Sequence, residues 1–97
     1  MAITVLIDRH LKPRHDAEVL ELLRELRVGA LRQRGYGRGE TLVDEADATH
    51  WLVVASWANA EAWKAWQGAT ERQGLEAKLA THLQGPAKYT VFHEVWD

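Results

Sequence analysis

The chain contains no cysteine and only one serine, Ser56, among its 97 residues. The lack of cysteine excludes disulfides, thiol nucleophiles, iron–sulfur clusters and zinc–thiolate sites. Ser56 lies in an apolar run without a G-x-S-x-G turn, so we do not expect serine hydrolase chemistry. A sequence without cysteine fits a reducing compartment, and we expect a cytoplasmic protein.

The sequence also has little net charge and no long apolar run. Twelve basic and fourteen acidic residues leave a formal net charge of -2, which gives no electrostatic attraction to nucleic acid or to an anionic membrane. No apolar stretch approaches the ~20 residues of a membrane span. We therefore expect neither nucleic acid nor a membrane as a partner.

Hydrophobic periodicity and turn signals predict one domain over residues 1–97, with elements in the order β-α-β-β-α-α-β. The expected strands are residues 2–9, 38–43, 50–57 and 88–95, and the expected helices are residues 16–33, 59–68 and 70–83. This order predicts an α+β fold in which helices cover one face of an antiparallel sheet. The uncovered face predicts a homodimer formed sheet to sheet.

Two local patterns within these elements lead to specific expectations. The first strand has Ile3, Val5 and Ile7 on one face, and Leu6 and Asp8 on the other. We expect the face that carries Asp8 to be the one that meets the helices. Asp16 can cap the first helix, and a glycine at position 29 inside that helix predicts a bend or a break.

Three segments resemble the antibiotic biosynthesis monooxygenase domain family. They are Gly35-Tyr36-x-x-Gly39-Glu40-Thr41-Leu42, Trp57-x-x-x-Glu61-Ala62-Trp63-x-x-Trp66 and Pro86-x-x-Tyr89. The resemblance implies a ferredoxin-like fold that pairs into a dimeric α/β barrel. It also implies a relation to quinol oxygenases and to haem-degrading enzymes.

Five of the eight aromatic residues are tryptophans. Trp57, Trp63 and Trp66 either pack the second helix onto the sheet or line a pocket. Trp66 matches a tryptophan that lines the ligand pocket in the haem-degrading relatives. A flat aromatic wall would suit a planar, polycyclic ligand.

Asp8 is the candidate general base. It falls where the haem-degrading relatives carry a pocket asparagine, and burial there would raise its pKa into the range needed to accept a phenolic proton. The alternative is an exposed carboxylate that pairs with an arginine. Tyr36 and Arg38 are expected at the pocket mouth, where an arginine would stabilise an oxyanion.

The five histidines show no metal-ligand spacing, and we expect no metal site. His82, near the end of the last helix, is favoured there by the helix dipole. His93 borders either a pocket or the dimer interface. The axial histidine of the haem-degrading relatives should fall about ten residues after Trp66, where this chain has Glu76, so we expect no haem and no other cofactor.

The resemblance thus implies a cofactor-independent monooxygenase that acts on a small aromatic or quinol-like substrate in an apolar pocket. The alternatives are a non-catalytic small-molecule-binding or stress-response dimer, and a haem-binding or haem-degrading protein. The catalytic candidates are Asp8, Trp66 and His93, and the substrate-binding candidates are Tyr36, Arg38, Trp57, Trp63 and His82.

Overall fold

The central strand of the sheet is β1 (Ile3–His10), in a computed structural model that describes residues 1–95. It pairs antiparallel with β3 (Asp47–Trp57) on one side and with β4 (Lys88–His93) on the other. At the edge, β2 (Tyr36–Asp44) pairs antiparallel with β3, which gives the order β2-β3-β1-β4. All four strands are therefore antiparallel to their neighbours.

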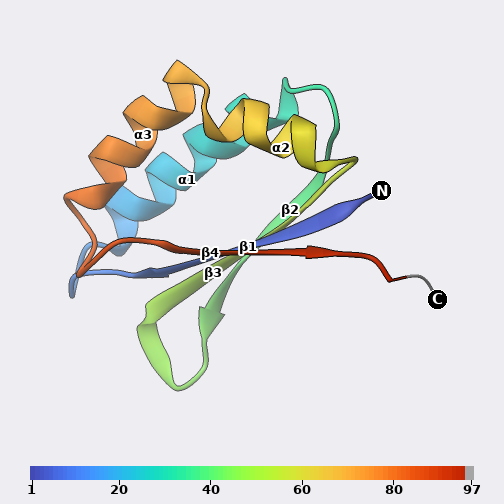
Figure 1. Cartoon of the computed structure of the whole chain (residues 1–97). Coiled ribbons are helices and arrows are strands. Elements are labelled where there is room, and N and C mark those ends of the chain that lie inside the picture. The colour runs from blue at the N-terminus through green and yellow to red at the C-terminus, as the bar shows by residue number, and fades with distance from the viewer. Residues whose placement is uncertain (96–97) are drawn as a thin grey trace.

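Helices cover only one face of this sheet (Figure 1). They are α1 (Asp16–Leu31), α2 (Ala60–Gln67) and α3 (Thr70–Ala80). The predicted α+β fold class and the predicted element order are confirmed. In Figure 1 the other face of the sheet has no helix over it, and the β2–β3 hairpin extends away from the helical layer.

Several predicted element ends move by a few residues. The last helix ends at Ala80 and not at Leu83, because the chain there must reach the sheet: Leu83 forms an isolated antiparallel bridge with Leu11. The N-cap of α1 is His15, and its side chain makes no capping hydrogen bond. Asp16 is instead the first helical residue, where its charge favours the helix dipole.

The two faces of β1 are the reverse of the sequence-based expectation. Its buried residues are those at odd positions, and these point toward the helices: Ile3, Val5, Ile7 and Arg9, followed by Leu11 just after the strand. Side chains alternate along a strand, so Leu6 and Asp8 lie on the uncovered face. The expectation was wrong because apolar residues stand on both faces, and the buried arginine continues the apolar series.

Helix α1 runs without a break through Gly29. The predicted stripe of Val19, Leu22, Leu23, Leu26 and Ala30 is buried. A Cβ atom at position 29 would lie 2.5 Å from Cη2 of Trp66 and 2.7 Å from Oε2 of Glu71. Glycine therefore stands here because the indole of α2 packs directly against the helix backbone.

Replacing Gly29 with alanine is expected to destabilise the fold, although alanine is the better helix former by about 1 kcal/mol. The buried Trp66 ring cannot move freely, and overpacking of this kind costs about 1 to 3 kcal/mol. The free energy of unfolding in urea measures the effect. Gly74→Ala in α3 is the control, since a Cβ there meets nothing within 4 Å, and it should stabilise by about 0.5 to 1 kcal/mol. Equal stabilisation by both changes would contradict this packing.

Candidate active site

A cavity of about 70 Å³ lies between the helices and the covered face of the sheet. Tyr36 of β2, Trp57 of β3, and Trp63 and Trp66 of α2 form its aromatic wall. The ring centroids of Tyr36 and Trp57 are 5.1 Å apart in an edge-to-face arrangement, and those of Trp57 and Trp63 are 5.8 Å apart. Residues of β2, β3 and α2 thus form the aromatic part of the cavity wall.

The same cavity is lined by three charged side chains that are largely out of solvent. Oε2 of Glu76 accepts a hydrogen bond from Nη2 of Arg9 at 2.7 Å and forms an ion pair with Nη2 of Arg72 at 2.9 Å. The residue exposures are 2% for Arg9 and 5% for Arg72. One carboxylate oxygen therefore joins the central strand of the sheet to helix α3.

Arg72 connects this charged group to the aromatic wall. Its guanidinium carbon lies 5.1 Å from the ring centroid of Trp63 and 5.5 Å from that of Tyr89. Its Nη2 also donates a hydrogen bond to the hydroxyl of Tyr89 at 2.9 Å. These cation–π contacts and hydrogen bonds fix the guanidinium between α2, α3 and β4.

Two buried donors of the cavity residues have no hydrogen-bond partner: Nε of Arg9 and Nε1 of Trp57. Buried donors are normally satisfied, and an unsatisfied one costs free energy. Both belong to side chains that line the cavity. These two side chains therefore each keep a donor without a partner among the described residues.

A model of the antibiotic biosynthesis monooxygenase family matches residues 2–78 of this sequence. The chain belongs to this family. The resemblance expected from the tryptophan and glycine motifs is thereby confirmed. No curated protein matches the sequence.

Solved structures resemble the chain closely in fold and only distantly in sequence. A conserved protein from Methanosarcina mazei Go1 has a TM-score of 0.91 at 14% identity, over 97% of this chain and 93% of that one. SnoaB, a cofactor-independent oxygenase from Streptomyces nogalater, has a TM-score of 0.88 at 14% identity, over 99% and 95% of the two chains. A crystal structure of an antibiotic biosynthesis monooxygenase has a TM-score of 0.85 at 19% identity, over 96% and 98%.

Within this family fold, four of the eight predicted site residues line the cavity: Tyr36, Trp57, Trp63 and Trp66. Glu76, at the position expected for an axial histidine, lines it as well. Arg38, His82 and His93 do not. Arg38 is exposed, and its backbone N–H donates to Oγ of Ser56.

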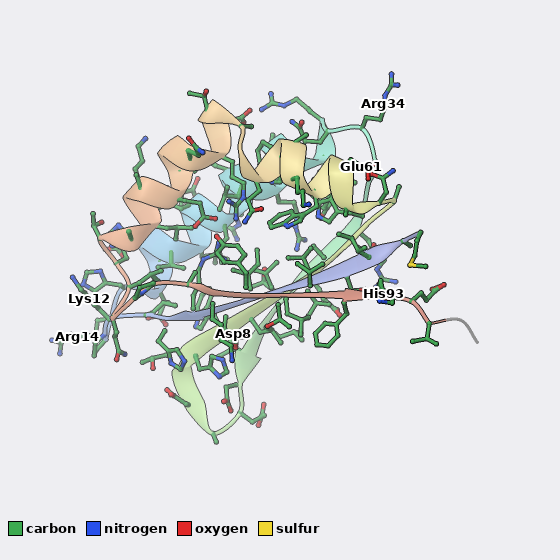
Figure 2. The ribbon with its side chains drawn as sticks, viewed as in Figure 1. Asp8, Lys12, Arg14, Arg34, Glu61 and His93 are labelled. Carbon is green, nitrogen blue, oxygen red and sulfur yellow. The ribbon has the colours of Figure 1, made fainter. Side chains whose placement is uncertain are left out.

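The two predicted histidines lie at other places in the fold. His82 follows α3 and contacts His15, with 2.8 Å between their Nδ1 atoms. His93 is exposed at the end of β4 (Figure 2), with its Nδ1 3.2 Å from the carbonyl of Glu94. Neither contributes to the cavity wall, and the catalytic and binding roles expected for them stay predictions.

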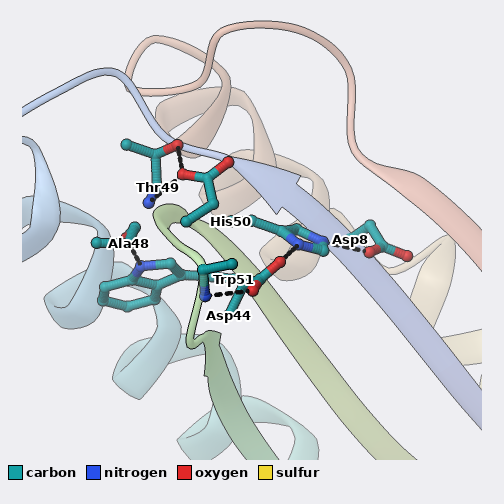
Figure 3. A network of polar contacts seen from close by, with 8 residues as sticks. Asp8, Asp44, Ala48, Thr49, His50 and Trp51 are labelled. Atoms are coloured by element: carbon teal, nitrogen blue, oxygen red, sulfur yellow. Dashed lines mark hydrogen bonds and ion pairs between the residues drawn. The ribbon is translucent and has the colours of Figure 1, made fainter.

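Asp8 points away from the helices, as Figure 2 shows, and does not face Trp66 across the cavity. Its Oδ1 is 2.6 Å from Nε2 of His50, whose Nδ1 is 2.9 Å from Oδ2 of Asp44 (Figure 3). The expected placement of Asp8 was wrong because the face of β1 was assigned in reverse. Its side chain instead pairs with a histidine on the uncovered face.

Sequence reasoning missed Arg9 and Arg72. Arg9 stands at the same parity as Ile3, Val5 and Ile7, so the alternation carried a signal for its burial. Arg72 precedes Leu75 and Leu79 by three and seven residues, which is the spacing of one buried helical stripe. An arginine on each of two buried faces indicates a charged group inside the fold.

Within the part of the chain that the structure describes, no cluster of three or more histidine, aspartate or glutamate side chains could hold a metal ion. Among the same residues, no helix has the length and apolar character to span a membrane.

The Asp44–His50–Asp8 contacts predict a pH dependence of stability. The hydrogen bonds that His50 donates to Asp44 and, second, to Asp8 raise the pKa of His50 above 6.5, and the hydrogen bond with His50 lowers the pKa of Asp44 below 3.8. The contribution of His50 is therefore complete below about pH 6.5 and disappears as the pH rises through its folded-state pKa. The contribution of Asp44 disappears only as the pH falls below 3.8.

The melting temperature of the wild type should exceed that of His50→Gln at pH 5.5, and the difference should shrink toward pH 8.5. The side chains are partly exposed, so we expect a difference of at most a few degrees. His93→Gln is the control, because His93 has no carboxylate contact among the described residues. A His50→Gln difference that is constant with pH would contradict the charged pairing.

Proposed function

We propose that the chain is a cofactor-independent monooxygenase that acts, as a homodimer, on a small aromatic or quinol-like substrate in the helix–sheet cavity. The observation that carries the proposal is the aromatic wall of Tyr36, Trp57, Trp63 and Trp66 in a chain of this family. Flat rings pack well against a planar substrate. The fold similarity to SnoaB, which is described as a cofactor-independent oxygenase, adds support.

In this proposal the substrate supplies the electrons. A hydroxylated ring loses a proton, and the electron-rich anion passes an electron to dioxygen. One oxygen atom then forms a bond to a ring carbon, and the other leaves as water with two hydrogens taken from the substrate. The protein has to bind the ring, hold it toward dioxygen and exclude bulk water.

The cavity residues suit these tasks. The guanidinium groups of Arg9 and Arg72 favour the ionised form of a bound hydroxyl, because an opposite charge in a low-dielectric site favours the charged species. Nε1 of Trp57 is a buried donor without a partner among the described residues, and in this proposal it donates a hydrogen bond to a substrate oxygen. Glu76 accepts a hydrogen bond from Arg9, forms an ion pair with Arg72, and acts as the positioning residue of both.

The size of the cavity restricts the substrate. Its volume of about 70 Å³ corresponds to roughly five to seven water positions at about 10–15 Å³ each. This space suits a single small ring. The polycyclic ligand expected from the tryptophans would need α1 or α2 to move away from the sheet.

The uncovered face of the sheet supports the homodimer. Strand register places five apolar side chains on it: Leu6, Leu42, Leu52, Val54 and Phe92. Phe92 is 53% exposed and Leu42 is 44% exposed. An exposed apolar patch on a strand surface is typical of a protein interface, and two such faces would cover one another.

Oxygen consumption with single-ring hydroquinones tests the proposed activity. We expect turnover without added flavin, haem or metal, and we expect Trp57→Phe to lower kcat/KM about tenfold or more, because it removes the unpartnered indole N–H and keeps an aromatic ring. Trp51→Phe is the matched control: its indole donates to the carbonyl of Ala48 at 3.0 Å and lies outside the cavity. The control should cost about 1 kcal/mol of stability and leave kcat/KM unchanged.

Two results would contradict the proposal. Oxygen uptake absent from every hydroxylated ring that binds would make the chain a non-catalytic binding module. Equal loss of kcat/KM in Trp57→Phe and Trp51→Phe would indicate that the reaction does not take place in the cavity.

A further inference from the structure

We propose that the cavity takes its ligand as a monoanion, whose carboxylate or phenolate oxygen binds beside Arg9 and Arg72. The ligand class is a hydroxylated single-ring aromatic acid, or an equally small enol that is already ionised. This inference rests on the proposed function in using the same cavity, and it goes further by assigning the charge of the ligand.

The buried charges of the cavity do not balance. Arg9 and Arg72 each carry one positive charge, and among residues 1–95 Glu76 is the only acidic side chain that lines the cavity. Both guanidinium groups reach the same oxygen, Oε2. Within residues 1–95 neither arginine pairs with any other carboxylate. One positive charge is therefore left without a counter-charge inside the fold.

An uncompensated charge is costly where water is excluded. Arg9 is 2% exposed and Arg72 is 5% exposed, so solvent screens neither well. Buried charges in proteins are paired or hydrogen-bonded because desolvation penalises an isolated ion. A second anion in the cavity would supply the missing charge.

The donor pattern matches an oxyanion. Arg9 uses Nη2 for Glu76 and leaves Nε buried without an acceptor. A guanidinium offers its N–H groups as a planar fork that fits two oxygens of a carboxylate. One side of the Arg9 fork is thus occupied by the protein's own carboxylate, and the Nε–H remains for a carboxylate or phenolate oxygen of the ligand.

The other unpartnered donor lies toward the opposite end of the strands. Arg9 pairs with Trp51 in the β1–β3 register, whereas Trp57 pairs with Ile3. The ring of Trp63 lies between Trp57 and the arginines, because it stacks under Arg72 on one side and contacts Trp57 on the other. A single ring whose anionic group binds beside Arg9 and Arg72 then lies against Trp63, which contacts Trp57.

Binding of 4-hydroxybenzoate and of neutral 4-hydroxybenzamide tests the inference, because the two probes share a ring and a hydroxyl. We expect the wild type to bind the anion at least tenfold more tightly at pH 7.5 and low salt. Arg9→Gln should abolish this preference. Arg24→Gln is the control, since the Arg24 side chain is 67% exposed and lies outside the cavity, and it should retain the preference.

Glu76→Gln provides a test with the opposite sign. It keeps a hydrogen-bond acceptor and removes the only negative charge of the cavity, so anion affinity should rise several-fold over the wild type. This variant tests the anion site even if Arg9→Gln does not fold. Equal binding of the two probes by the wild type, or unchanged or weaker anion binding in Glu76→Gln, would overturn the inference.

Failure of the inference is separable from failure of the oxygenase proposal. Oxygen uptake with neutral hydroquinones, together with no preference for 4-hydroxybenzoate, would overturn the anion site and keep the activity. A charge-dependent preference for the anion without oxygen uptake by any bound ring would support the anion site and overturn the activity.

Discussion

The alternation of side chains along β1 determines both faces of this protein. Because β1 is hydrogen-bonded to a strand on each side, its register determines which residues of β3 and β4 point toward the helices. Arg9 enters the cavity and Asp8 pairs with His50 on the other face. A shift of register by one residue would move Arg9 to the uncovered face and remove its positive charge from the cavity.

The cavity combines an apolar aromatic environment with buried charged side chains. Its aromatic wall is apolar, yet Arg9 and Arg72 bring charge into it. The Glu76 carboxylate holds both in place, which preorganises donors toward the space that a ligand would fill. Stability and binding are therefore coupled at this carboxylate: it compensates one arginine and leaves the other able to attract an anion.

Much of the fold can be predicted from the sequence, because periodicity and turn residues are local signals. The stripe of α1 and the order of elements along the chain follow from spacing and turn residues, whereas the sequence leaves open whether Trp57, Trp63 and Trp66 pack the core or line a cavity. The role of Gly29 cannot be predicted locally, because it depends on the Trp66 indole from another helix. The face of β1 is ambiguous for a related reason: apolar residues occur on both sides, and only tertiary packing decides between them. Arg9 of β1 meets Arg72 and Glu76 of α3 only after this helix has packed on the sheet, so no sequence motif predicts their contact.

In the proposed function, the helix–sheet cavity binds a ligand whose oxygens approach the unpartnered donors of Arg9 and Trp57. The most direct measurement is a ¹H–¹⁵N NMR titration that follows the indole and guanidinium N–H signals with 4-hydroxybenzoate. The account predicts shifts of the Trp57 Nε1–H and Arg9 Nε–H signals, whereas the Trp51 indole, already bonded to the carbonyl of Ala48, stays in place. Shifts confined to side chains outside the cavity, with both of these signals unchanged at saturation, would contradict it.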